Sequence, residues 1–301
     1  MRTAVVTGAT GFIGGWLVRA LARQGVSVTA ITRRPVASSL PGAAHIRTSG
    51  ERRLPVVLAE AGPDIVFHLA GMSGEEAARR DPALALEANC RAVWTMLDAV
   101  HRSGCRPVIV LASSVAVYGE TMGRPAVEDD PLHGTSPYEL SKIAAETAAR
   151  CFAATGLRVR IARIGNVFGP GDRSVARLIP DTIAAIREGR APVLHAPASM
   201  RGHLHVADCA RGLIALGSAA GSGLDGRAVN LCQEVGITNM DLVRLMLAQS
   251  GRDDLRPVRA SLPQPASVRL ASAALAREAL GWRPEITLQD GLADLLERPV
   301  A

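Results

Sequence analysis

A glycine-rich turn near the N-terminus constrains the fold of this chain more than any other feature. It follows an apolar run, Thr3–Thr7, that is typical of a strand, and it precedes an amphipathic pattern from about Phe12 to Gln24 that is typical of a helix. Its glycines allow a tight turn at Gly8, a close approach to the main chain at Gly11, and close helix–strand packing at Gly14. The segment therefore predicts a strand–turn–helix unit that begins a layered α/β fold.

The rest of the first half alternates short apolar strands with amphipathic helices, which predicts a parallel sheet covered on both faces. We expect further strands at Val26–Thr32, Asp64–Leu69, Val108–Ala112 and Leu157–Ile164, with helices over Pro82–Arg102 and from Ser136-Pro137 onward. After about Gly165 we expect five helices: near Val175–Glu188, from Asp208 onward, after the N-cap Thr238, near Ser272–Leu280 and near Leu288–Glu297. In the same part of the chain we expect short strands near Pro192–His195, Arg201–Val206 and Ala228–Leu231.

These elements predict the α/β class, with a Rossmann-type doubly wound parallel sheet and a smaller C-terminal α/β substrate lobe. We place the nucleotide-binding domain at residues 1–165 and the lobe mainly at 166–301. Elements near 200–235 are expected to return to the main sheet.

The composition narrows the classes of partner. The chain has 301 residues and a net charge of +6, but its arginines are dispersed and aromatic residues make up only 3%, so we expect no nucleic-acid partner. The five cysteines show no CxxC or Cys/His cluster, so we expect no metal. No apolar run reaches the roughly 18–20 residues of a membrane span. A strand at the very start, with no basic and apolar leader, leads us to expect a cytoplasmic protein with no membrane partner.

The glycine turn also indicates a ligand. A helix that begins directly after such a turn offers main-chain N–H groups and a positive dipole end to a pyrophosphate, so residues 8–14 predict a dinucleotide site. We assign Gly8, Thr10, Gly11, Phe12, Ile13 and Gly14 to it. Thr32 is followed by Arg33 and Arg34 where an acidic residue would bind the ribose of NAD. Arginine suits a 2′-phosphate, so NADP(H) is favoured and NAD(H) stays open.

A tyrosine and a lysine predict the reaction centre. Lys142 is the only lysine of the chain and lies four residues after Tyr138, so both share one face of the expected helix. A nearby ammonium group should lower the pKa of the phenol and suit it to proton exchange, while Lys142 also holds the cofactor ribose. Ser114 follows the apolar strand Val108–Ala112, where its hydroxyl would steady an alkoxide oxygen. Tyr138, Lys142 and Ser114 are therefore our catalytic candidates.

Several motifs together resemble the extended short-chain dehydrogenase/reductases, often called NAD-dependent epimerase/dehydratases. Besides the glycine turn, they are the DIVFHLAG segment at 64–71, Asn89, the SSVAVYG segment at 113–119, the RIGNVFGPG segment at 163–171 and the LGWRP segment at 280–284. The resemblance implies cofactor contacts from Leu69, Ala70, Asn89, Tyr138, Lys142 and Ile164, and substrate contacts from Ser113, Ser114, Asn166 and Arg201. It also implies a homodimer, formed through the helices near Leu84–His101 and Tyr138–Cys151.

The resemblance implies a nucleotide-diphosphate sugar as the small-molecule substrate. Dehydratases of the family carry Asp-Glu after the catalytic hydroxyl, where this chain has Val115-Ala116, so dehydration is disfavoured. We therefore expect an NADPH-dependent oxidoreductase that reduces the 4-keto group of a nucleotide-diphosphate deoxysugar, with Tyr138 as the proton donor.

Three alternatives remain beside this interpretation. The first is a nucleotide-sugar 4-epimerase with tightly bound NAD. The second is a reductase of a non-sugar ketone or aldehyde, because Gly202, His203 and the segment Leu262–Ser267 depart from the family's substrate-lobe pattern. The third, a dinucleotide-sensing or scaffold protein, is disfavoured because such proteins usually lack the Tyr or the Lys that this chain retains.

Overall fold

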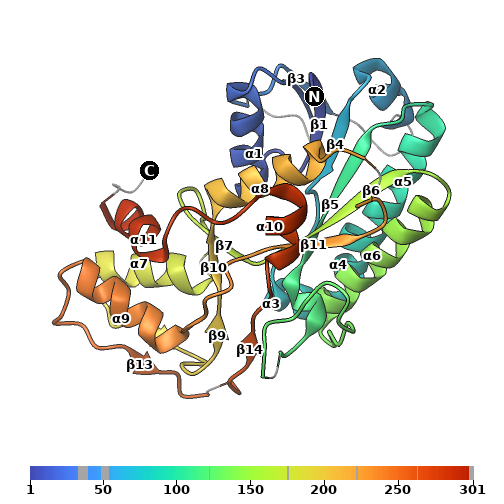
Figure 1. Ribbon diagram of the computed structural model, residues 1–301. Coiled ribbons are helices and arrows are strands. Elements are labelled where there is room, and N and C mark those ends of the chain that lie inside the picture. The colour runs from blue at the N-terminus through green and yellow to red at the C-terminus, as the bar shows by residue number, and fades with distance from the viewer. Residues whose placement is uncertain are drawn as a thin grey trace.

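A seven-stranded parallel sheet forms the centre of the computed structural model, which describes residues 1–32, 40–48, 54–121, 123–174, 176–221, 223–262 and 264–297 (Figure 1). The strand order β11-β6-β5-β4-β1-β2-β3 places the first strand inside and winds outward in both directions, so the predicted doubly wound Rossmann-type sheet is confirmed. Its strands are β1 (Thr3–Thr7), β2 (Ser27–Thr32), β3 (His45–Thr48), β4 (Ile65–His68), β5 (Val108–Ser114), β6 (Arg158–Ile164) and β11 (Ala228–Leu231).

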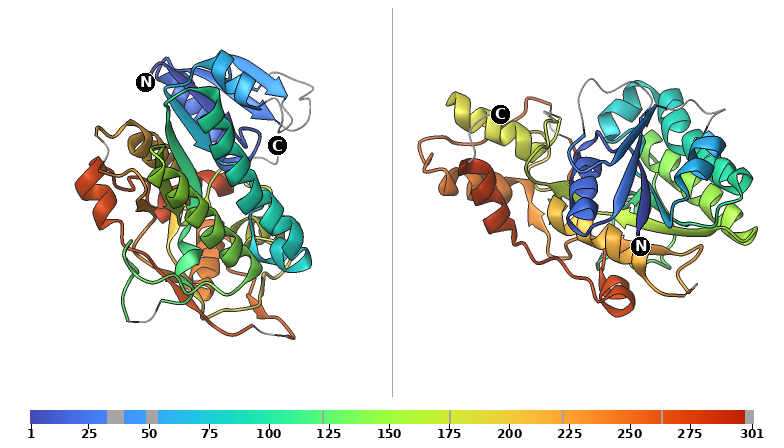
Figure 2. Two further views of the ribbon diagram at one scale, coloured as in Figure 1. Left: turned by 90° about the vertical axis from the view of Figure 1, so that its right-hand side faces the viewer. Right: turned by 90° about the horizontal axis from the view of Figure 1, so that it is seen from above.

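Helices cover both faces of this sheet, as the view from above shows (Figure 2). Apolar side chains such as Leu17 and Leu213 pack into the core of one face, and Leu97 and Ala149 pack into the core of the other. The first face carries α1 (Phe12–Arg23), α8 (Val206–Ser218) and α10 (Ala274–Leu280), and the second carries α2 (Leu54–Ala61), α5 (Ala92–Ser103) and α6 (Pro137–Ala154). Burial on both faces explains why the strands are almost continuously apolar.

The helix expected over Pro82–Arg102 is interrupted. It begins after Asp81, whose carboxylate accepts a hydrogen bond from Leu84 N at 2.9 Å as the predicted N-cap. It then runs as α4 (Pro82–Leu86), a π-helical turn η2 (Glu87–Arg91) and α5. Such turns insert one residue into a helix and often occur at functional sites. This turn carries Asn89.

Other elements differ from the sequence-based expectation. The single strand expected over Arg201–Val206 is two, β9 (Met200–Arg201) and β10 (His203–His205), separated at Gly202, where a Cβ atom would lie 2.0 Å from the oxygen of Gln233. Helix α8 begins at Val206 rather than Asp208, because the His205 ring accepts a hydrogen bond from Ala207 N. Helix α2, strand β3 and α3 (Glu75–Arg80) were not expected, since short elements carry little periodic signal.

The C-terminal lobe has its own small core, in which Ile183, Leu242 and Leu292 are buried together. Figure 1 shows this lobe beside and below the main sheet, with α7 (Leu178–Glu188), α9 (Asn239–Gln249) and α11 (Leu288–Glu297). Its short strands form the pairs β7 (Asn166–Phe168) with β10 and β8 (Val193–Leu194) with β13 (Val258–Arg259), and the triplet β12 (Ile237–Thr238), β9 and β14 (Val268–Arg269).

Three later elements pack with the main sheet or with its covering helices. Strand β11 pairs with β6, α8 packs against α1, and α10 contacts α8 and β11. The division of the chain at residue 165 stays a prediction. Within the described part of the chain, no helix has both the length and the apolar character that crossing a membrane requires.

Candidate active site

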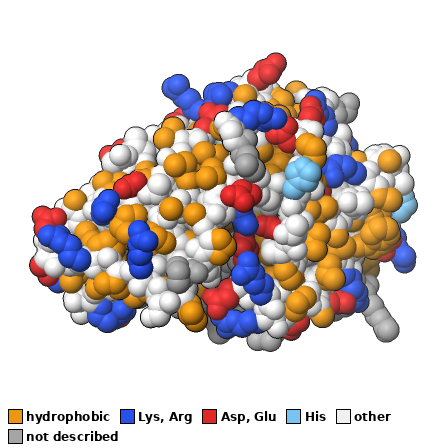
Figure 3. Space-filling model, turned by 90° about the horizontal axis from the view of Figure 1, so that it is seen from below, with side chains coloured by type: hydrophobic (Ala, Val, Ile, Leu, Met, Phe, Trp, Pro, Cys, Tyr) orange, Lys and Arg blue, Asp and Glu red, His pale blue; other side chains and the backbone are white. Residues whose placement is uncertain are grey.

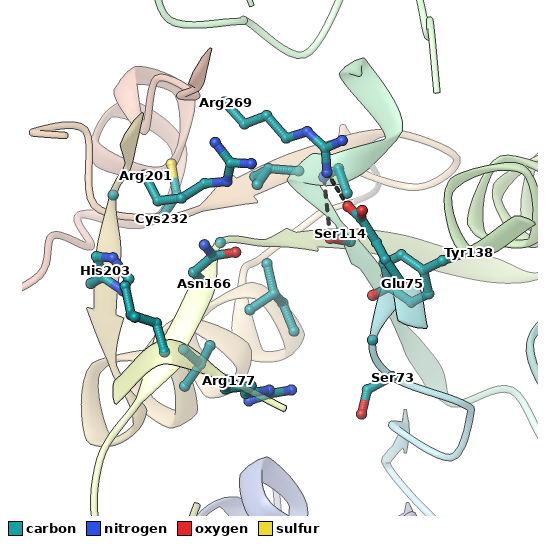
Figure 4. A pocket seen from close by; sticks show the side chains of 18 of the residues that line it. Ser73, Glu75, Ser114, Tyr138, Asn166, Arg177, Arg201, His203, Cys232 and Arg269 are labelled. Atoms are coloured by element: carbon teal, nitrogen blue, oxygen red, sulfur yellow. Dashed lines mark hydrogen bonds and ion pairs between the residues drawn. The ribbon is translucent and has the colours of Figure 1, made fainter. Parts of the chain in front are cut away.

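A cavity of about 770 Å³ lies at the carboxyl ends of the central strands, and residues of the C-terminal lobe complete its wall (Figure 4). Open α/β sheets bind their ligands at this edge. The structure brings together here nine of the predicted site residues: Ile13, Leu69, Ser113, Ser114, Tyr138, Lys142, Ile164, Asn166 and Arg201.

Helix α6 supplies Tyr138 and Lys142 and has a well-defined start. Ser136 is its N-cap, with its hydroxyl accepting from Glu139 N, while the Glu139 carboxylate accepts from Ser136 N at 2.8 Å. Pro137, the first helical residue, has the backbone angle that a helix requires. This capping box holds the first turn, and with it Tyr138, at the cavity wall.

The phenol of Tyr138 is held in its protonated form. Burial raises its pKa, and this effect exceeds the opposing hydrogen bond with Ser114 and the positive charge of Arg177. The carboxylates of Glu75 and Glu139 raise the pKa of the phenol further. The expectation that a neighbouring ammonium group lowers the pKa of Tyr138 is therefore not met in this structure.

The ammonium group of Lys142 has a different partner. Its Nζ donates to the main-chain oxygen of Ala112 at 3.1 Å, beneath the end of β5. Burial lowers the pKa of Lys142 to about 8, against the opposing charge of Glu146. The i, i+4 spacing thus places both side chains at one cavity, as predicted, but it does not pair them directly.

The two serines at the end of β5 have different roles. The Ser114 hydroxyl accepts a hydrogen bond from Ala116 N at the start of the 3₁₀ turn η3 (Val115–Tyr118), and it faces Tyr138. The Ser113 hydroxyl instead donates to Glu146 Oε1 at 2.6 Å, and both residues are buried. The Ser113 hydroxyl is thus engaged with that carboxylate, and the contact of Ser113 with a substrate stays a prediction.

The glycine turn has the geometry that a dinucleotide requires. A Cβ atom at Gly8, whose φ is +69°, would lie 2.7 Å from Ala70 N, and one at Gly14 would lie 2.1 Å from the oxygen of Gly8. Among the described residues, α1 has no side-chain cap and no acidic residue in its first turn, so its N-terminal N–H groups face no competing carboxylate. These residues therefore fit a pyrophosphate, with Gly8 packed against the loop after β4.

The contacts of Gly8, Thr10, Gly11, Phe12 and Gly14 with a cofactor stay predictions, as does the contact of Ala70. Arg33 and Arg34, on which the preference for NADP(H) rests, lie outside the described residues. Within those residues, no group of three or more His, Cys, Asp or Glu side chains is arranged to hold a metal ion.

Asn89 connects the loop after β4 with the catalytic helix. Its Oδ1 accepts a hydrogen bond from Met72 N, and its Nδ2 donates one to Ser141 Oγ, both at 2.9 Å. The Ser141 hydroxyl donates in turn to the main-chain oxygen of Tyr138. Asn89 is buried and both ends of its amide are engaged. It therefore acts as a support for the Tyr138 backbone, while its direct contact with a cofactor stays a prediction.

Arg201 is held at the cavity wall by the segment that leads into β14. Its guanidinium donates to the main-chain oxygen of Ser267 and, at 2.7 Å, to the Ser267 hydroxyl. Burial and the nearby charge of Arg269 lower the pKa of Arg201 to about 10. An anionic group in the cavity would relieve this repulsion between cations.

Several charged residues at the cavity were missed by the sequence analysis, and three of them are labelled in Figure 4. They are Glu75, Arg177 and Arg269, and Figure 4 shows them around the space that Tyr138 and Asn166 face. Arg177 lies 3.2 Å from a carboxylate oxygen of Asp172, and Arg269 pairs with Glu75. In a chain whose cations are arginines almost throughout, no local pattern distinguishes these two. Figure 3 likewise shows basic and acidic side chains interspersed over the lower face of the molecule.

The chain is similar to known proteins over most of its length. A sequence model of the NAD dependent epimerase/dehydratase family matches residues 4–232. A dTDP-glucose 4,6-dehydratase of Streptomyces griseus is 32% identical, with 96% of this chain and 91% of that protein covered. A GDP-6-deoxy-D-mannose reductase of Pseudomonas aeruginosa is 31% identical over 78% of this chain and 79% of its own length. The solved structure of MoeE5 with UDP-glucose and NAD is 30% identical, with a TM-score of 0.83 and coverage of 98% and 97%.

Proposed function

The chain belongs to the NAD-dependent epimerase/dehydratase family and is an NAD(P)-dependent enzyme, and from that premise we propose that it reduces the 4-keto group of a nucleotide-diphosphate deoxysugar with NADPH. The observation that carries the proposal is the meeting of Tyr138, Ser114 and Lys142 at one cavity beside the glycine turn. The phenol of Tyr138 is protonated at neutral pH and can therefore donate a proton, as reduction of a carbonyl requires.

When bound, the dinucleotide supplies the hydride that reaches the carbonyl carbon. The chain's own residues protonate and stabilise the carbonyl oxygen. Tyr138 gives its phenolic proton to that oxygen as the alcohol forms, and the resulting phenolate is reprotonated from solvent. The Ser114 hydroxyl hydrogen-bonds the same oxygen and stabilises its developing negative charge. Lys142 holds the cofactor ribose at the end of β5 and provides positive charge below the reacting groups.

The side chains that follow Ser114 argue against dehydration, although a similar protein bears the name of a dehydratase. Val115 and Ala116 line the cavity where an acid and a base would be needed to remove water. Of the other carboxylates that line the cavity, Glu75, Glu120 and Asp172, the first and the last are engaged in ion pairs with arginines, and none directly follows Ser114. We therefore do not assign elimination chemistry to this site.

A nucleotide-sugar 4-epimerase is the second candidate. It is favoured by the likeness to MoeE5, solved with UDP-glucose and NAD, and by relatives named UDP-glucose 4-epimerases. An epimerase oxidises and re-reduces the same carbon, so it retains its NAD. The Arg33-Arg34 pair after β2 favours NADPH, which is consumed and released. Reduction of a ketone outside the sugar nucleotides is a third outcome of the test.

One set of measurements separates these candidates. The protein is purified, any bound nucleotide is identified by mass spectrometry, and oxidation of NADPH and NADH is followed with a 4-keto-6-deoxy sugar carried on dTDP or GDP. Consumption of NADPH, and bound NADP rather than NAD, would support the proposal. Bound NAD together with interconversion of UDP-glucose and UDP-galactose would establish the epimerase instead. Turnover of simple ketones, with none of the sugar nucleotides, would point to the third candidate.

We also propose that the enzyme is a homodimer formed through α4, α5 and α6. These helices expose large apolar side chains on the outer face, among them Leu84, Leu86, Leu140 and Trp94, the last 51% exposed. Exposure of such an apolar face to water is unfavourable, and packing against the same face of a second copy would bury it. Trp94→Glu should convert a dimer to a monomer in sedimentation analysis, and a wild-type protein that is monomeric at high concentration would refute the assignment.

A further inference from the structure

Arg269 joins the C-terminal part of the chain to the catalytic helix. It ends strand β14, which pairs in parallel with β9 so that Arg269 stands opposite Arg201. Its side chain is 19% exposed and forms an ion pair with Glu75 of α3. Its Nη2 lies 2.8 Å from Oε1 of Glu139 in α6. One guanidinium group thus lies between two carboxylates that come from different helices.

Both of these carboxylates act on Tyr138. Glu139 is the next residue in the chain and only 2% exposed, and the N–H groups of Thr135 and Ser136 donate to its other oxygen at 2.7 and 2.8 Å. These donors hold the carboxylate of Glu139 in place. Together with Glu75 it adds negative charge around the phenol.

Other charged and polar groups face the phenol from separate elements. Arg177 approaches from the start of α7 and Ser114 from the end of β5, while Lys142 lines the same cavity from the next turn of α6. Of these, Arg177 is paired with Asp172 and Lys142 with a main-chain oxygen. Arg269 differs from all of them, because it is the arginine that contacts both carboxylates beside the phenol.

We propose that Arg269 is a positioning residue for the reaction. Its guanidinium group neutralises the charges of Glu75 and Glu139 and thereby sets the electrostatic environment in which Tyr138 releases its proton. This proposal deepens the proposed function and rests on Tyr138 as the proton donor. Without the guanidinium group, two negative charges would remain beside the phenol. The phenolate would then be less stable, and the pKa of Tyr138 would rise.

The tyrosine content of the chain allows a direct test without substrate or cofactor. Tyr118 and Tyr138 are its only tyrosines. The ultraviolet absorbance of tyrosinate is titrated in the wild type and in Tyr138→Phe, and the difference isolates the ionisation of Tyr138. We expect Arg269→Met to move this midpoint upward by at least about half a pH unit, and Arg269→Lys, which keeps the charge, to move it much less.

Two further variants complete the experiment. Glu75→Gln should move the midpoint downward, because it removes one of the two negative charges. Arg79→Met is the matched control: Arg79 also pairs with Glu75, but at 3.6 Å and 60% exposed, so solvent screens it and the midpoint should stay in place. If circular dichroism shows that Arg269→Met is unfolded, the proposal is tested by whether the midpoint of Tyr138 moves downward in Glu75→Gln.

If Arg269→Met folds and its midpoint is unchanged, the proposal is overturned. If Arg269→Met does not fold, an unchanged midpoint in Glu75→Gln overturns it. An equal shift in Arg269→Lys would also overturn it, because it would indicate shape rather than charge. The titration does not depend on which substrate the enzyme takes, so a failure of the proposed reaction would appear separately as absent turnover. With an active enzyme, the pH profile of kcat should shift in the same direction as the titration.

Discussion

The Nζ atom of Lys142 donates a hydrogen bond to the main-chain oxygen of Ala112, 3.1 Å away. This contact fastens the only lysine of the chain beneath the end of β5, and burial there lowers the pKa of its ammonium group to about 8. The group is therefore charged at neutral pH but loses its charge within the mildly alkaline range. Its chemical reactivity should differ accordingly from that of an exposed lysine.

Lys142 should react with amine reagents at an unusually low pH. With a pKa of about 8, half of its side chain is neutral at that pH, whereas an ordinary lysine is neutral to less than about 1%. We expect acetylation of Lys142, followed by peptide mass spectrometry, to increase steeply between about pH 7 and 9 and to be slowed by a bound dinucleotide. The N-terminal amine is the internal control. Acetylation that begins only above about pH 10 would show that the pKa of Lys142 is not lowered in the folded protein.

Tyr138→Phe should lower kcat by about 10²–10⁴-fold while dinucleotide affinity stays within a few-fold of the wild type. The phenol supplies a proton, and phenylalanine preserves its packing but not that proton. Tyr118→Phe is the matched control, because its hydroxyl contacts Arg163 and Asn230 rather than the cavity. Steady-state kinetics and fluorescence titration with the dinucleotide measure both effects. Similar loss in the two variants would show that the phenol of Tyr138 has no special role.

Gly14→Ala should greatly weaken dinucleotide binding, whereas Gly15→Ala should be tolerated. A Cβ atom at Gly14 would lie 2.1 Å from the oxygen of Gly8 and force the turn apart, but at Gly15 the nearest atom is 3.7 Å away. The two glycines are adjacent in α1, so helix propensity is matched between the variants. Binding is measured by calorimetry and stability by thermal unfolding. Equal affinities in the two variants would remove the glycine turn from the cofactor site.

Arg163→Met should destabilise the protein by about 3–5 kcal/mol, and Arg150→Met by less than about 1 kcal/mol. Both guanidinium groups lie 2.8 Å from the same oxygen of Glu146. The side chain of Arg163 is 2% exposed and that of Arg150 is 41% exposed, so only the first substitution removes the buried cation and leaves Glu146 with a solvent-screened partner. Urea denaturation at neutral pH measures the two free energies of unfolding. A cost of similar size in both would mean that burial does not decide the strength of these pairs.

His68 should make the protein sensitive to acid. It is buried beside Thr7, and burial, with the charge of Lys142, lowers its pKa to about 3. The unfolded chain takes up a proton near pH 6.5 and the folded chain does not, so stability is complete above that pH and is lost as the pH falls below it.

Between about pH 7 and pH 5, this residue alone should lower the free energy of unfolding by about 2 kcal/mol. Urea denaturation at the two pH values should show a smaller difference for His68→Gln than for the wild type. His101→Gln, at an exposed position on α5, is the control and should keep the wild-type difference. An unchanged pH dependence in His68→Gln would show that His68 is already protonated in the folded protein.

Local patterns in the sequence were sufficient to identify the sheet, the glycine turn and the Tyr138–Lys142 pair. Each of these depends on residues within a few positions of one another. The steric requirement at Gly8 and Gly14 belongs to one turn, and the i, i+4 spacing places two side chains on one helical face. The π-helical turn at Asn89 and the division at Gly202 escaped the same patterns, because packing against distant segments decides them.

The tertiary structure alone decided the partners of several groups at the cavity. Strand order brings Arg269 to Glu139, turns the Ser113 hydroxyl to Glu146, and directs Lys142 to a main-chain oxygen rather than to Tyr138. Burial then determines the direction in which the pKa of a phenol or an ammonium group moves. The sequence therefore determined which chemical groups are present and their local spacing. Their charges and contacts follow from long-range packing, which no local spacing encodes.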